Sequence, residues 1–412
     1  MPDLRRYEWE RIIQRIHNGE LIPIISDRVV SDFLPGYREF SSKWADYIEY
    51  PFSYKPNLSR LAQFVSVDSG SRTQAKHDFL TYAKVNLLQS IAEERGGTIA
   101  VENAESLRFA EIADQFGYPQ SKNGQENPLD LLARFPLPIY ITTSYFNFLE
   151  IALAKYRQTP QVEICQWHDE QAQPEVEAGV PTETEPVAAK LQEILTESFN
   201  IQEMQTILLS MNIYYQDFRH GTRIELAHDL IAHLQMTGRI WEFIRVGKRE
   251  RPDARWQDII MPEESGTDVN IETPLVYHLY GLDERPESLV LTETDYLDFF
   301  KHIALDKDAK KSFFSYTLRA ELRQKPLLLL GYDLQDWEFR ALFHGIIGEL
   351  RELPNARGMR WAIQLSAESA KDIPRANKYL EQYFGEHRFS VYWGSPAEFV
   401  QQLWQHYFEK YG

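Results

Sequence analysis

Three segments of the sequence combine an apolar run with residues that can do chemistry. They are Pro138-Ile-Tyr-Ile-Thr-Thr-Ser-Tyr145, Leu275-Val-Tyr-His-Leu-Tyr-Gly281 and Leu327-Leu-Leu-Leu-Gly-Tyr-Asp333. Each run stops at a small or polar residue, as a buried strand does at the carboxyl edge of a parallel sheet. Ligands bind at this edge in open α/β folds. The sequence therefore places its candidate chemistry at the ends of three strands of one sheet.

The candidate for proton transfer is His278, because an imidazole titrates near neutral pH. It lies two residues before Tyr280, and residues i and i+2 of a strand point to the same face. His278 would therefore face the same cleft as Tyr280, about 7 Å deeper along the strand. The alternative is a hydrogen-bonded core histidine, the commoner role for a lone histidine on a buried strand.

Candidate ligand contacts follow the other strands. The hydroxyl of Ser144 can hold a ligand atom or can cap a helix that begins near Asn147. Gly331 either allows a ligand to approach the backbone closely or is a simple turn glycine.

The turn after the first predicted strand reads Ser26-Asp27-Arg28-Val29. Arg28 can pair with a phosphate through two hydrogen bonds, whereas Asp27 repels a phosphate unless it turns away. The alternative is an ordinary strand-to-helix turn with a surface ion pair.

Strands and amphipathic helices alternate toward both ends of the chain, which predicts an α/β fold with a mainly parallel sheet. The predicted strands are residues 21–25, 137–142, 274–280, 325–330, 359–365 and 389–393. Between them lies a compact helical block, residues 188–252, with apolar residues at helical spacing. Asn200 and Glu203 form a predicted capping box within this block. We therefore expect an α/β domain over residues 1–170 and 274–412, joined to an inserted helical bundle by linkers 171–187 and 253–273.

Composition and charge limit the classes of function that this sequence can have. The 412 residues carry a net charge of −17, which argues against a nucleic-acid partner because such proteins need basic stripes. No apolar run approaches the roughly 18 residues of a membrane span, and the N-terminus lacks an apolar signal core. Cys165 is the single cysteine, which favours a reducing cytoplasm and excludes a four-cysteine zinc module. No histidine or carboxylate spacing indicates a metal site.

In this order the three segments resemble the nucleotide-binding core of the sirtuin-like superfamily, over residues from about 10 to 170 and 270 to 408. The match is most like the prokaryotic branch associated with defence. Four further segments support it: Leu61-Ala-Gln-Phe64, Asn127-Pro-Leu-Asp-Leu-Leu132, Leu289-Val-Leu-Thr-Glu-Thr-Asp-Tyr296 and Tyr392-Trp-Gly-Ser-Pro396. The resemblance implies a Rossmann-like doubly wound sheet. In active members it implies hydrolysis of NAD+ to nicotinamide and ADP-ribose.

The same resemblance assigns site residues. Ser144 would place the catalytic water, and His278 or Tyr280 would anchor the ribose. The implied nucleotide contacts are Ser26, Asp27, Arg28, Gln63, Thr143, Tyr145, Gly281, Gly331 and Tyr332.

Three family positions are altered, however. The turn after the first strand has no glycine, Ser144 replaces an asparagine, and Tyr280 replaces a histidine. The family's zinc cysteines are also missing, so a protein deacylase is not expected.

The helical block resembles the death-fold-like effector-associated domains of bacterial conflict systems. Its matching segments are Leu191-Gln-Glu-Ile-Leu-Thr-Glu-Ser-Phe199, Glu225-Leu-Ala-His-Asp-Leu-Ile231 and Gly238-Arg-Ile-Trp-Glu-Phe-Ile244. Such domains are adaptors, so the resemblance implies a protein partner and a homo-oligomer. The alternative is an unrelated helical insertion. Two functions stay open: an NAD+ glycohydrolase recruited through the adaptor, and a catalytically degenerate protein that binds a nucleotide or serves as a scaffold.

Overall fold

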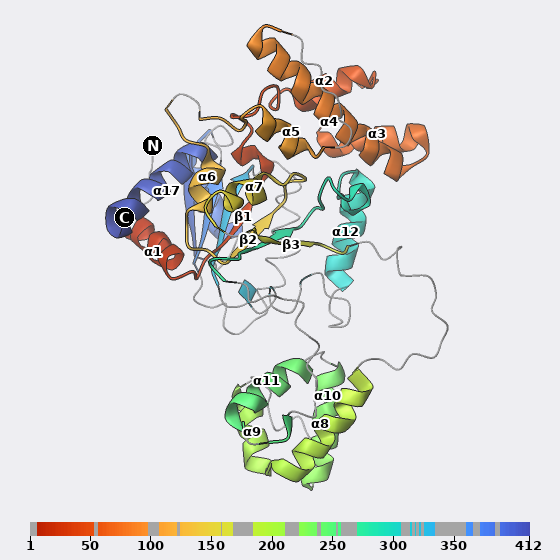
Figure 1. Ribbon diagram of the computed structural model, residues 1–412, viewed down its shortest axis with the longest axis vertical. Coiled ribbons are helices and arrows are strands. Elements are labelled where there is room, and N and C mark those ends of the chain that lie inside the picture. The colour runs from red at the N-terminus through yellow and green to blue at the C-terminus, as the bar shows by residue number, and fades with distance from the viewer. Residues whose placement is uncertain are drawn as a thin grey trace. The chain divides into compact units, whose positions relative to one another are not determined.

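The chain divides into an α/β unit and a helical unit (Figure 1). The α/β unit comprises Met1–His168, Asp268–Ala304 and Phe313–Gly412, and the helical unit comprises Asp169–Thr267 and Leu305–Ser312. The computed structural model describes residues 6–52, 57–97, 107–121, 124–157, 159–167, 184–210, 222–236, 240–252, 254–256, 270–305, 314, 318, 321–322, 325–333, 360–365, 371–383 and 388–412. Most of both predicted linkers therefore lies outside the described residues. No described helix is long and apolar enough to cross a membrane.

Seven parallel strands form the sheet of the α/β unit, in the order β3-β4-β2-β1-β5-β6-β7. They are β1 (Ile22–Ile25), β2 (Ile139–Thr142), β3 (Gln161–Ile164), β4 (Leu275–His278), β5 (Leu327–Tyr332), β6 (Arg360–Leu365) and β7 (Arg388–Trp393). The predicted doubly wound parallel sheet is thus confirmed. The chain leaves β1 toward β2 on one side and returns to β5 on the other, so the strand order reverses at β1. This is the switch point at which open α/β sheets bind ligands.

One strand, β3, was not predicted. It is a four-residue edge strand whose side chains are only partly buried. Edge strands of this kind carry no continuous apolar run, so the pattern that reveals the six other strands is missing.

The helices of this unit form two groups, of which the first lies against the sheet and the second stands apart from it (Figure 1). One group contains α1 (Arg6–His17), α6 (Pro128–Ala133), α7 (Phe148–Ala154) and α17 (Pro396–Tyr411), which pack together in the order α1, α17, α6, α7. The other contains α2 (Phe40–Tyr47), α3 (Leu58–Ser69), α4 (Arg72–Arg95) and α5 (Phe109–Gln115). The remaining described helices of this unit are the short η1 (Asp27–Val29) and η6 (Pro286–Ser288), with α12 (Glu293–Leu305) and α16 (Ile373–Tyr383).

Side chains fix where several helices start. Asn57 accepts a hydrogen bond from the Arg60 N–H at the start of α3, and Ser71 accepts one from Gln74 at the start of α4. Ser395 and Glu398 form a capping box at α17. Each contact satisfies a backbone N–H that has no partner inside its helix.

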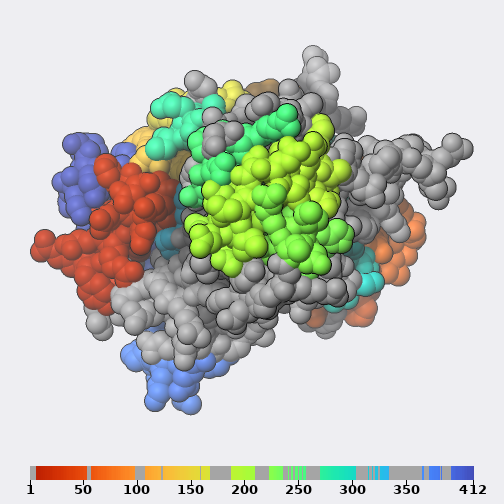
Figure 2. All heavy atoms as spheres, turned by 90° about the horizontal axis from the view of Figure 1, so that it is seen from below, coloured from red at the N-terminus to blue at the C-terminus, as the bar shows by residue number. Residues whose placement is uncertain are grey.

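The helical unit packs α8 (Thr184–Ser198), α9 (Ile201–Ser210), α10 (Arg223–Met236) and α11 (Ile240–Glu250) around an apolar core. In Figure 2 these helices form a rounded body. The predicted capping box is confirmed, because the Asn200 and Glu203 side chains each accept the other's backbone N–H at 2.9 and 2.8 Å.

Trp256 corrects the predicted boundary of this unit. It lies in the range predicted to be a linker, yet it is 5% exposed and packs in the helical core. Gly247 makes room for it, because a Cβ there would lie 2.6 Å from the indole ring. Trp256 also donates a hydrogen bond to the Arg251 carbonyl at 2.7 Å.

Candidate functional site

The ends of β1, β2 and β5 meet at the switch point of the sheet. Thr143, directly after β2, and Tyr332, at the end of β5, are both buried, and their hydroxyl oxygens lie 3.2 Å apart. Since β1 lies between these two strands, the contact passes over its carboxyl end. The structure therefore brings together residues that the sequence placed in one site although they are 189 positions apart.

Gly331 serves the packing of this edge. Its φ is +81°, and a Cβ would lie 2.4 Å from the Ser26 hydroxyl oxygen and 3.1 Å from Val29. That hydroxyl donates a 2.6 Å hydrogen bond to the Gly331 carbonyl. The space beside Gly331 is thus filled by residues of the turn after β1. This favours the interpretation of Gly331 as a turn glycine over direct contact with a ligand.

A buried glutamine extends this edge to the last strands. Gln364 of β6 accepts a hydrogen bond from the Gly331 N–H at 2.7 Å and donates one to the Gly394 carbonyl at 2.7 Å. Gln364 is 1% exposed, so both ends of its amide are satisfied inside the protein. Gln364 was not among the predicted site residues, and its only signal in the sequence is a polar amide within an apolar strand.

The two charged residues of the turn after β1 have protein partners. The Tyr37 hydroxyl donates a hydrogen bond to the Asp27 carboxylate. The half-exposed Arg28 forms an ion pair with Asp333 at 3.7 Å. This geometry favours the alternative of an ordinary turn with a surface ion pair over a dedicated phosphate clamp.

Ser144 contributes its hydroxyl to its own loop. Its oxygen accepts a hydrogen bond from the Phe146 N–H at 3.2 Å, while the Ser144 N–H donates to the Thr142 hydroxyl at 3.0 Å. The N-cap of α7 is Asn147. Ser144 thus stabilises the loop between β2 and α7 without being the N-cap residue itself.

His278 is fully buried at the end of β4. Its Nε2 pairs with Glu150 of α7, and its Nδ1 lies 3.2 Å from the Ser144 carbonyl oxygen. Burial lowers the pKa of His278, but the Glu150 carboxylate, the Ser144 carbonyl and Asp283 together outweigh it, so the net pKa is raised. The contacts are those of the hydrogen-bonded core histidine that was the alternative to a catalytic one.

Tyr280 and Tyr145 also lie in the interior. The Tyr280 ring packs edge-on against Tyr296 and Phe299, at 5.4 Å from each ring centre. The Tyr145 hydroxyl donates to the Val290 carbonyl at 2.7 Å. Both side chains therefore hold the loop after β4 in place, and at 2% and 6% exposed they offer little surface to a ligand.

Gly281 and Gln63 have structural contacts as well. Gly281 has a φ of +89°, and a Cβ there would lie 2.4 Å from the Ser288 carbonyl oxygen. The side-chain amide oxygen of Gln63 accepts hydrogen bonds from the Thr294 N–H and hydroxyl at 3.0 and 2.8 Å. Gln63 therefore caps the first turn of α12, and Gly281 allows the loop after β4 to fold back on itself.

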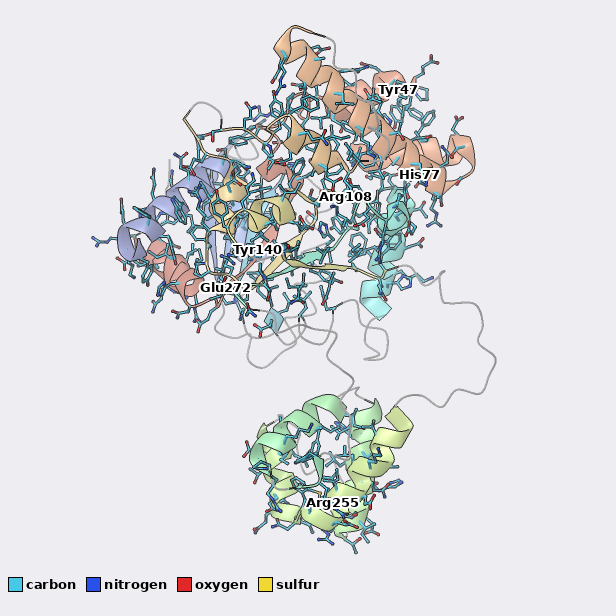
Figure 3. The ribbon with its side chains drawn as sticks, viewed as in Figure 1. Tyr47, His77, Arg108, Tyr140, Arg255 and Glu272 are labelled. Atoms are coloured by element: carbon cyan, nitrogen blue, oxygen red, sulfur yellow. The ribbon has the colours of Figure 1, made fainter. Side chains whose placement is uncertain are left out.

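Two buried carboxylates near His278 were not predicted. Glu150 lies on the otherwise apolar buried face of α7. Asp283, in the loop after β4, accepts a hydrogen bond from the Phe109 N–H at 2.9 Å and so caps α5. Arg108, labelled in Figure 3, lies beside Asp283 at the start of α5. In the sequence, Glu150 could have been recognised as a carboxylate among the apolar positions of a predicted helix.

A pocket of about 430 Å³ opens beside the loop that follows η1. Its charged lining consists of Asp32, Glu39, Glu94 and the single cation Arg38, which pairs with Asp32. A pocket with three carboxylates repels a pyrophosphate. None of these residues was among the predicted ligand contacts. Among the described residues, no group of three His, Cys, Asp or Glu side chains is arranged to hold a metal ion.

Comparison with family models gives two matches. A SIR2-like domain matches residues 245–387, a range that contains β4, β5 and β6. Effector-associated domain 7 matches residues 191–252, which contain α9, α10 and α11. No curated protein gives a significant match. Residues 245–387 thus match a SIR2-like domain, and the match to effector-associated domain 7 lies in the sequence between strands β3 and β4 of the parallel sheet.

Proposed function

We propose that this chain is a sirtuin-like effector of prokaryotic conflict or defence systems that acts through protein contacts, with an α/β unit that does not hydrolyse NAD+. The observation that carries the proposal is the state of the three predicted catalytic side chains. His278 is paired with Glu150, the Ser144 hydroxyl is bonded within its loop, and the Tyr280 ring is buried among aromatic rings. Each side chain is used to hold the protein together at the place where the family does chemistry.

The charges near the switch point support the same proposal. The turn after β1 offers a nucleotide no glycine, Arg28 is paired with Asp333, and the adjacent pocket is acidic. Cofactors with a pyrophosphate need exposed backbone N–H groups and positive charge. The α/β unit is therefore a weaker nucleotide site than its fold suggests.

The effector-associated domain supports the protein-contact part of the proposal. In the described helical unit all buried side chains are apolar, so its recognition chemistry lies on the surface. Its partner is another protein, and we expect the full chain to form a homo-oligomer.

The second candidate is an NAD+ glycohydrolase. It is favoured by the contact between Thr143 and Tyr332, which keeps two polar hydroxyls at the switch point. In that case Ser144 would place the water, and His278 or Tyr280 would anchor the ribose. NAD+ would then be the substrate and no metal would be needed.

The test is NAD+ consumption by the purified full chain at high protein concentration, with detection of nicotinamide and ADP-ribose and a parallel measurement of NAD+ binding. We expect no turnover. Turnover that is lost in Ser144→Ala or His278→Ala would overturn the proposal and establish the hydrolase. As a matched experiment, the double variant Ser144→Asn with Tyr280→His restores the family's residues, and activity in this variant alone would show that those two positions account for the loss.

A further inference from the structure

Three ionisable side chains from different parts of the chain are buried around the end of β4. His278, Glu150 and Asp283 are 0%, 8% and 8% exposed. Neither carboxylate belongs to the set that the family resemblance assigns to chemistry, and the proposed function gives them no role beyond the pairing of Glu150 with His278. They therefore need an explanation of their own.

The contacts of His278 indicate that the cluster holds a proton. Nε2 faces the Glu150 carboxylate and Nδ1 faces the Ser144 carbonyl oxygen, so both partners are acceptors. A neutral imidazole has one N–H and cannot donate to both, whereas an imidazolium can.

Asp283, the second carboxylate of the cluster, also favours a protonated cluster. Asp283 Oδ2 accepts the Phe109 N–H, but Asp283 Oδ1 has no hydrogen-bond partner among the described residues. Buried oxygens without donors disfavour the charged form of an acid, because burial removes the water that would solvate the charge.

The cluster lies where two loops are joined. The Asp283 N–H donates to the Tyr145 carbonyl at 2.8 Å, and the Tyr145 hydroxyl donates to the Val290 carbonyl at 2.7 Å. His278 adds its contact to Ser144. The loop after β2 is therefore joined to β4 and the loop after it by contacts of which two come from residues of the cluster, the Asp283 backbone N–H and the His278 ring.

We propose that His278, Glu150 and Asp283 form a proton-linked latch, which holds these two loops together while the cluster is protonated and loosens them as the pH rises. The charged groups facing the cluster are Arg108 at the start of α5 and Lys84 of α4, both near Asp283. Both cations oppose protonation of Asp283. This latch would operate in a scaffold and in an enzyme alike.

The latch is expected to weaken as the pH rises because the pKa values of His278 and Asp283 are both raised in the folded protein. The pKa of His278 is raised, because Glu150, the Ser144 carbonyl and Asp283 together outweigh burial. Burial raises the pKa of Asp283 against the opposing Phe109 N–H, Arg108, Lys84 and His278. Both groups bind protons more tightly in the folded state. The contribution of His278 is complete below its unfolded pKa of about 6.5 and is lost as the pH rises through its folded pKa.

Hydrogen exchange of the full chain tests the latch. Protection of peptides covering residues 143–150 and 279–290, corrected for the intrinsic rate, is measured from about pH 6 to about pH 9, around the ordinary histidine pKa. We expect protection to fall severalfold, while peptides from α10 in the helical unit stay unchanged. Equal pH dependence in both regions, or better protection at high pH, would overturn the proposal.

Two nearly isosteric variants separate the latch from mere packing. Glu150→Gln keeps an acceptor for His278 but removes the charge that holds the proton, so the pH dependence should flatten. Asp283→Asn keeps an acceptor for the Phe109 N–H and should raise protection at high pH. If both variants keep the full pH dependence of the unmodified chain, the cluster is only a structural contact. If Glu150→Gln does not fold, the Asp283→Asn profile alone decides the matter.

Discussion

The two units of this protein differ in what they bury. Among the described residues, every buried side chain of the helical unit is apolar, whereas the α/β unit buries a lysine, a histidine and several carboxylates. An apolar core contributes stability that does not depend on protonation. The helical unit can therefore act only through its surface, while the α/β unit has an interior that can respond to pH.

Several buried polar groups of the α/β unit lie at one edge of its sheet. Those in the last two residues of a strand or in the two residues that follow it are Ser26, Thr142, Thr143, Ser144, His278 and Gln364. Their hydrogen bonds run between neighbouring strand ends and loops. The comparison teaches that the edge of a sheet can be rich in polar groups although those groups are bonded to one another within the protein.

The largest expected effect tests the charged interior. His278→Ala removes one partner of a buried ion pair, leaves Glu150 without it and opens a cavity. We expect the unfolding free energy of the α/β unit to fall by about 3–5 kcal/mol. Denaturant unfolding followed by circular dichroism measures it, and the exposed His77 of α4, in the same unit, provides the control through His77→Ala. A loss no larger than that of the control would mean that the buried pair contributes nothing.

A substitution in the apolar core tests the other half of the comparison. Leu230 is fully buried in α10, so Leu230→Ala should lower the stability of the helical unit by about 2–5 kcal/mol. The loss should be the same at every pH, because no ionisable group is removed.

The matched control for Leu230 is Ile224→Ala on the same helix, where the side chain is 61% exposed. That change should stay within about 0.5 kcal/mol. Thermal unfolding at two pH values distinguishes the two substitutions, and a shifted transition of the α/β unit in Leu230→Ala would show that the units do not unfold independently.

The sequence predicts the fold because burial leaves a repeating pattern. Six strands read as apolar runs, and the helices of the helical unit read as apolar stripes. Two features were not predicted from the sequence, and each has a local cause. The strand Gln161–Ile164 is a half-exposed edge, and Trp256 lies in a polar stretch yet packs into the helical core.

The site was predictable only in part. The rule that parallel strands end at one edge correctly brings Thr143 near Tyr332 and Ser26 near Gly331. This rule does not predict which residues hydrogen-bond to each other. The two acceptors of His278 lie 128 and 134 positions away in the chain, and no local pattern links them. The hydrogen-bond partners of a histidine decide whether its ring is free to react. The sequence therefore predicts the fold but does not predict whether His278 is catalytic.

The smallest expected effect separates backbone strain from close packing at the loop after β4. Gly281 and Gly70 both have positive φ, +89° and +67°, but a Cβ at Gly281 meets the Ser288 backbone while one at Gly70 meets nothing within 4 Å. Gly70→Ala should therefore cost about 1 kcal/mol for the left-handed backbone alone. Gly281→Ala should cost at least about 2 kcal/mol, because the loop must also move away. Equal losses in denaturant unfolding would show that this loop yields easily. In that case the packing of the loop after β4 against the loop after β2, on which the latch depends, would be looser than the distances indicate.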